Sequence, residues 1–183
     1  MKRRAVLQFS AFFLVLLSGA VAVLPAARAD EAKDTQALLE ALGKSKLTLL
    51  DGVRQAAKTA GAPISAKFEL EDGKLSLSVY TAGKGLAVEP EKNVLQELSG
   101  SPESEKWAPN VEVFKDVPHV ARSSEQLTLM ALGKASLADI IARVQEKQPG
   151  TVFSVTPIIR NHRPVAEVLV ADQGKVKKLM QPL

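Results

Sequence analysis

The 183-residue chain contains no cysteine and only two histidines, His119 and His162. The lack of cysteine excludes disulfide bridges, thiolate metal sites and cysteine nucleophiles. The histidines lie in unlike contexts, and no Gly-x-Ser-x-Gly pattern accompanies them, so nothing positive supports a serine hydrolase. We therefore predict no catalytic residues, no cofactor and no metal site. A hydrolase that uses carboxylates is the enzymatic alternative.

Aromatic residues are also scarce, with one tryptophan and one tyrosine. Trp107 follows a polar stretch rich in serine, glycine and glutamate at residues 99–105. One interpretation is that the indole packs into the core. The other is that it faces a binding partner, because tryptophan is favoured at interaction hot spots.

The only long apolar run lies at the N-terminus. Basic residues 2–4 precede it, it continues to Leu24, and Ala27-Arg28-Ala29 has the small residues of a cleavage site. This order predicts a signal peptide over residues 1–29 and export to the periplasm or the exterior. The densest apolar block is shorter than the roughly 20 residues that span a bilayer. We therefore expect no stable membrane anchor after cleavage, a retained anchor being the alternative.

Charge argues against nucleic acid as a partner. The predicted signal peptide holds four of the 24 basic residues and none of the 20 acidic ones, so the remaining chain is formally neutral. Nucleic-acid binding needs clustered lysine and arginine. Basic residues do predominate over residues 148–183. We expect a protein or peptide partner, and the oligomeric state stays open.

An internal repeat organises the rest of the chain. The tetrapeptide Ala41-Leu42-Gly43-Lys44 recurs at residues 131–134, and residues 48–51 correspond to residues 136–139. A period near 90 residues predicts two copies of one small domain. We place them at residues 30–116 and 117–183, with residues 81–116 as an unmatched insertion at the end of the first copy.

The first copy has apolar spacing typical of two helices and a hairpin. The first helix is expected to begin at Asp34 and end at Gly43, and the second to begin at the cap residue Thr48. A hairpin follows over residues 64–80, with a turn at Asp72-Gly73. Within the insertion, residues 91–98 predict a helix and residues 111–114 a strand.

The second copy repeats this order. A helix capped by Ser123 or Ser124 precedes one capped by Ser136, and His119 falls in a solvated loop before them. Strands are expected over residues 151–159, 165–170 and 175–180. Weak calcium binding is one interpretation of the clustered acids Glu69, Glu71 and Asp72 at the first hairpin's end. They lack the spacing of an EF-hand loop, so a solvated hairpin end is the favoured interpretation.

A Ser/Thr-Leu-x-Asp helix start, a Gly/Pro stop and a hairpin resemble the PepSY domain, over residues 48–80 and 136–180. The resemblance implies an α+β fold of two tandem PepSY-like units, each with a small antiparallel sheet packed on its helices. It also implies an exported, non-catalytic binding or regulatory role, often directed at peptidases, with another envelope protein as the alternative target. A small-ligand or metal carrier is a further alternative. The first copy lacks an obvious third strand after Tyr80.

The second copy supplies the remaining candidate binding residues. Arg160, His162 and Arg163 surround a predicted turn, where they are either ordinary turn residues or a tip that contacts an anion or a peptide. Together with Trp107, they are the candidate partner-binding residues.

Overall fold

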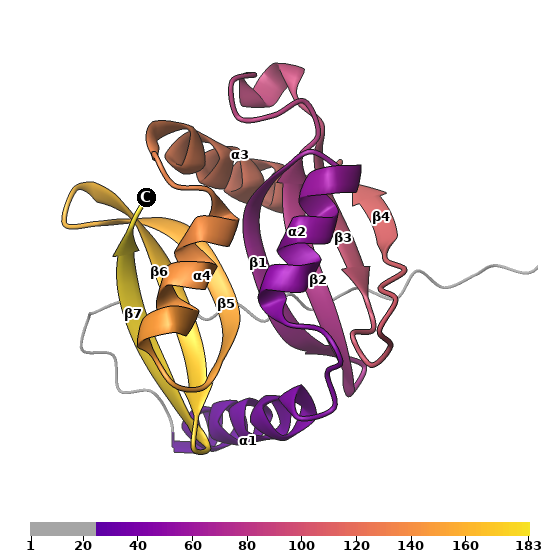
Figure 1. The fold of residues 1–183 in the computed structure, drawn as a ribbon, viewed down its shortest axis with the longest axis vertical. Coiled ribbons are helices and arrows are strands. Elements are labelled where there is room, and N and C mark those ends of the chain that lie inside the picture. The colour runs from indigo at the N-terminus through magenta and orange to yellow at the C-terminus, as the bar shows by residue number, and fades with distance from the viewer. Residues whose placement is uncertain (1–24) are drawn as a thin grey trace, which may run out of the picture.

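The computed structural model describes residues 25–183 (Figure 1). Within this range the chain forms four α-helices and one seven-stranded sheet in which all paired strands are antiparallel. The sheet order is β4-β3-β2-β1-β5-β6-β7. The combination of helices with an antiparallel sheet confirms the predicted α+β class. The strands are β1 (Ala62–Glu71), β2 (Lys74–Ala82), β3 (Leu95–Gly100), β4 (Asn110–Val113), β5 (Thr151–Arg160), β6 (Arg163–Asp172) and β7 (Lys175–Pro182).

Helices α2 (Leu49–Thr59) and α4 (Leu137–Lys147) lie side by side on one face of the sheet (Figure 1). Each begins at its predicted cap residue, and in each the cap forms a capping box with the third helical residue. The Thr48 hydroxyl accepts a hydrogen bond from the Asp51 amide at 3.1 Å, and the Ser136 hydroxyl accepts one from Asp139 at 3.2 Å. In both, the aspartate at the third helical position accepts a hydrogen bond from the cap residue's own amide, which satisfies two donors at each helix start.

The hydrophobic core lies between these two helices and the sheet. Apolar residues recur every three or four positions in α2 and α4, so one face of each helix is buried. Buried positions largely alternate along β5 and β6, β2 is buried on both faces, and the edge strand β4 is exposed throughout. Burial of these side chains supplies most of the stabilisation of the fold. The largest fully buried side chains include Leu49, Ile64, Leu77, Leu137, Ile140 and Ile141.

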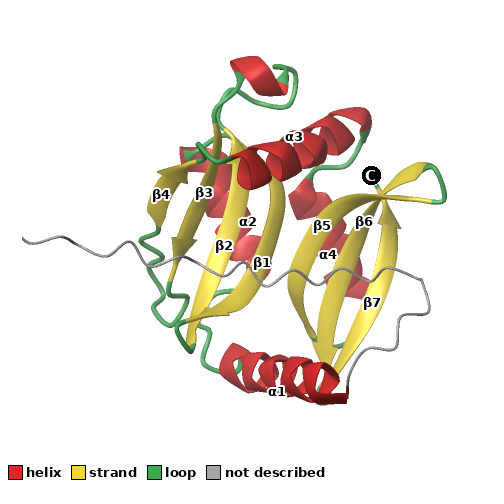
Figure 2. Cartoon of the chain, turned by 180° about the vertical axis from the view of Figure 1, so that it is seen from behind, coloured by secondary structure: helices red, strands yellow, loops and turns green. Residues whose placement is uncertain are grey.

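Helices α1 (Pro25–Leu42) and α3 (Val117–Leu132) lie towards opposite ends of the strands (Figure 2). Both start earlier than the sequence indicated. Asp34 lies inside α1 and does not cap it. Asp116, not Ser123 or Ser124, caps α3, and Pro118 occupies its first turn, where the missing N–H costs nothing. His119 is therefore a helical residue and not part of a loop.

The predicted helix over residues 91–98 is wrong. A single 3-10 turn, η1 (Pro90–Lys92), leads into β3, which pairs with β2. Leu95 and Leu98 are both buried, and their three-residue spacing imitates a helix. In a strand the two side chains point to opposite faces, and both are buried because α2 and α3 cover different faces here. The first hairpin therefore does have a third strand.

The predicted signal peptide falls mostly on residues 1–24, which lie outside the described residues, and its cleavage site falls within α1. Among the helices of the described range, none is long and apolar enough to cross a membrane.

Candidate functional site

Strand β7 forms one outer edge of the sheet and is exposed over its first four residues. Its hairpin with β6 closes through Gln173 and Gly174, whose φ angles of +48° and +72° are those of a type I′ turn. In such a two-residue hairpin the flanking pair, Asp172 and Lys175, is hydrogen-bonded, and the pairs then alternate. The backbone N–H groups of Val176, Lys178 and Met180 consequently point away from β6.

Positive charge exceeds negative charge along this edge. Lys177 pairs with Asp172 at 2.6 Å, and Lys178 pairs with Glu167 at 2.9 Å. No acidic residue in the described part of the chain forms an ion pair with Arg160, Arg163 or Lys175. An extended segment that adds to this edge therefore meets surplus cationic groups.

The predicted turn between β5 and β6 is confirmed. Asn161 and His162 occupy its two central positions with φ of +51° and +59°. Arg160 and Arg163 are directly paired across the strands, and like charges in that position repel each other. All four side chains are exposed. The fold thus brings together three of the candidate binding residues at one cationic hairpin tip.

Trp107 does not join them. Its side chain is only 4% exposed, and its Nε1 donates to the Gly100 carbonyl at 3.4 Å. The Gln55 side chain donates to the Trp107 carbonyl oxygen at 2.8 Å, which ties the segment to α2. The buried indole fits the interpretation that Trp107 packs into the core and does not face a partner.

His119 caps a small aromatic stack at the start of α3. Its ring lies over Phe114 with 5.0 Å between centroids, and Phe114 lies 5.8 Å from Tyr80. The His119 backbone N–H and ring both contact the Asp116 carboxylate and hold the pKa of that group below its usual value. The imidazole thus helps to hold Asp116, the cap residue of α3, in place.

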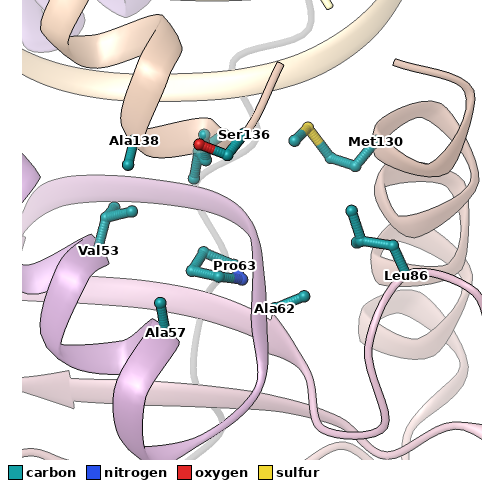
Figure 3. Close-up of a pocket in the computed structure, with 9 residues that line it drawn as sticks. Val53, Ala57, Ala62, Pro63, Leu86, Met130, Ser136 and Ala138 are labelled. Atoms are coloured by element: carbon teal, nitrogen blue, oxygen red, sulfur yellow. The ribbon is translucent and has the colours of Figure 1, made fainter. Parts of the chain in front are cut away.

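A small cavity lies between α2, the beginning of β1 and the loop that joins α3 to α4 (Figure 3). Its volume is about 120 Å³, against roughly 300–1,000 Å³ for typical small-molecule sites. Ser136 brings the oxygen atom seen in the close-up, and that hydroxyl is already used in the α4 cap. The cavity is therefore a packing gap and not a substrate cleft. It is lined by Val53, Ala57, Ala62, Pro63, Leu86, Met130, Ser136, Leu137 and Ala138.

Three carboxylates from two strands form a cluster. One oxygen atom from each of Glu69, Glu71 and Glu97 lies within 4.8 Å of the others. Burial raises the pKa of Glu97, and the neighbouring Glu69 and Glu71 act in the same direction. Sequence reasoning missed Glu97 because it assigned that segment to a helix; the strand assignment would have placed it beside β2.

No protein-family model matches the chain, and no curated protein or solved structure matches it either.

Proposed function

We propose that this chain is an exported, non-catalytic binding protein built from two PepSY-like copies, and that it binds an extended, acidic protein segment along β7. The signal-peptide pattern of residues 1–29 supports export. The copies are placed at residues 30–116 and 117–183.

Equivalent irregularities support the duplication. Gly61 and Gly150 both precede the first strand of a hairpin, with φ of +100° and +105°. A Cβ atom would lie 2.4 Å from the Ala82 carbonyl oxygen at the first glycine and 2.3 Å from that of Ala171 at the second. Gly61 and Gly150 are 89 residues apart, and so are the residues that they face, Ala82 and Ala171.

The strand register supports the same relation. Register shifts occur between Pro63 and Ser65 in β1 and between Val152 and Ser154 in β5, again 89 residues apart. Ala66 and Val155, separated by the same number, pair with each other where β1 meets β5. Direct pairing of equivalent residues is what a twofold axis between two copies requires. By position in the sheet β3 corresponds to β7, so the residues without a counterpart are the long connection 83–94 and the segment 101–116.

The observation that carries the binding proposal is the edge of β7. It offers outward N–H groups at Val176, Lys178 and Met180, and strand addition gains affinity from such main-chain groups. Lysines on an edge strand also prevent self-association, because they repel a second copy of the same edge. An acidic segment relieves that repulsion, which makes it the favoured partner.

Peptide display against the whole chain tests this proposal. Val176→Pro removes one outward N–H and leaves the β6 ladder intact, since proline is tolerated on the solvent side of an edge strand. Val176→Thr is the matched control, because it keeps the N–H and the β-branched shape. We expect enriched acidic peptides that bind the threonine variant at least tenfold more tightly than the proline variant. Equal binding to both variants, with both folded, contradicts strand addition.

The partner class follows from the PepSY resemblance, which points to an envelope peptidase. Acidic segments of such peptidases are the first to compare with the selected peptides. A selection that returns basic or uncharged sequences contradicts the proposed charge complementarity.

A further inference from the structure

A cluster of carboxylate and hydroxyl groups lies on strands β1, β2 and β3, in the half of the sheet away from β7. Glu69 and Glu71 are two residues apart in β1 and so project from the same face, and Glu97 lies in β3. The strand between them, β2, presents Ser76 and Ser78 to this face, because Ser76 pairs with Glu69 and Ser78 is two residues on. Carboxylates and hydroxyls therefore converge here.

The Ser76 hydroxyl lacks a hydrogen-bond partner. Ser76 is 4% exposed, yet its Oγ atom forms no hydrogen bond. The Ser78 hydroxyl, on the same face, lies beside the Glu97 carboxylate. A buried hydroxyl without a partner is costly. A ligand that binds oxygen atoms, such as a metal cation, would pair with this hydroxyl.

The charge at the cluster is only partly neutralised. Lys67 forms an ion pair with Glu69. Within the described residues, no ion pair is formed by Glu71 or Glu97. The three carboxylates lie close enough to repel one another, and a bound cation offsets that repulsion.

We propose that Glu69, Glu71 and Glu97, with the Ser76 hydroxyl, form a calcium site. Calcium takes six to eight oxygen ligands at about 2.3–2.6 Å, so two oxygens on one ion lie at most about 5 Å apart. The three carboxylate oxygens lie within 4.8 Å of one another, which meets that limit. Magnesium keeps several of its waters and is rarely held by an all-protein set of ligands. Carboxylate and hydroxyl oxygens also disfavour softer metals. Water supplies the remaining ligands.

Thermal unfolding of the full chain with calcium chloride tests the site, with sodium chloride of equal ionic strength as the blank. For a dissociation constant of about 1 mM, typical of extracellular calcium modules, 10 mM calcium raises Tm by about 3–6 °C. Glu97→Gln and Glu71→Gln should each lose most of this rise. Glu146→Gln, an exposed position on α4, should keep it.

Three results would overturn the proposal. They are an unchanged Tm of the unaltered chain in calcium, an equal rise in the Glu71→Gln and Glu146→Gln variants, and a rise with magnesium as large as that with calcium. Glu71 is exposed at the end of β1, so its variant is expected to fold even if the buried Glu97 position does not tolerate change. The calcium test does not depend on the β7 proposal, because the two sites share no residue.

Discussion

Replacing Gly61 or Gly150 by alanine should destabilise the chain strongly. At each position the backbone adopts φ near +100°, a region that side chains rarely occupy. The added Cβ atom would also lie 2.4 Å or less from a backbone carbonyl oxygen. The strained conformation costs about 1–3 kcal/mol, and the required backbone shift adds to it, so we expect a loss of about 3 kcal/mol at either site.

Two other glycines provide matched controls. Gly73 and Gly174 also have positive φ, of +75° and +72°, but nothing lies within 4 Å of a Cβ atom there. Their alanine variants test the conformational cost alone, about 1 kcal/mol. The contrast between the two pairs therefore measures the close approach to the second strand together with the extra strain at φ near +100°.

Urea denaturation of the four variants measures these differences. With about 2–4 °C per kcal/mol for a chain of this size, Gly61→Ala and Gly150→Ala should also lower Tm by about 6–12 °C. The duplication further requires similar losses at both positions. Losses no larger than those of the Gly73 and Gly174 controls would refute the packing argument. A large loss at only one of the two positions would count against their equivalence.

Three further predictions concern single side chains. Ser136→Ala removes the α4 cap and should cost about 1 kcal/mol in the free energy of unfolding, measured by urea denaturation. Ser124→Ala, a half-buried position inside α3 that caps no helix, should be near neutral. Trp107→Ala should cost about 3 kcal/mol because the indole is buried, and a stability loss below 1 kcal/mol would favour the partner-facing interpretation instead. Burial raises the pKa of Glu97 in the folded state above its ordinary value of 4.5. The contribution of Glu97 to stability therefore falls as the pH rises from 4.5 through the raised pKa. Glu97→Gln should therefore flatten that part of the pH profile and be the more stable form at pH 7, which thermal unfolding at several pH values checks.

Features specified by neighbouring residues could be predicted from the sequence. The capping boxes at Thr48 and Ser136 depend on a residue three positions on, and both are confirmed. The Asp72-Gly73 turn is set by its own two residues, and it is confirmed as well. The start of α3 was also readable, since Asp116 two residues before Pro118 is a helix-start signal that was overlooked.

Features that depend on distant residues could not be read in the same way. Leu95 and Leu98 fit a helix by spacing, and only the covering of both sheet faces makes a strand possible. The carboxylate cluster depends on that strand, because Glu97 reaches Glu69 across β2. The edge position of β7 follows from the pairing of β1 with β5, which no local pattern encodes.

Amide hydrogen exchange tests the central claim most directly. A selected acidic peptide should slow the exchange of the Val176, Lys178 and Met180 amides, which point away from β6 in the free chain. The amides of Lys175, Lys177 and Leu179, already bonded to β6, should change little. Binding of the peptide without added protection at the three outward amides would contradict strand addition at β7.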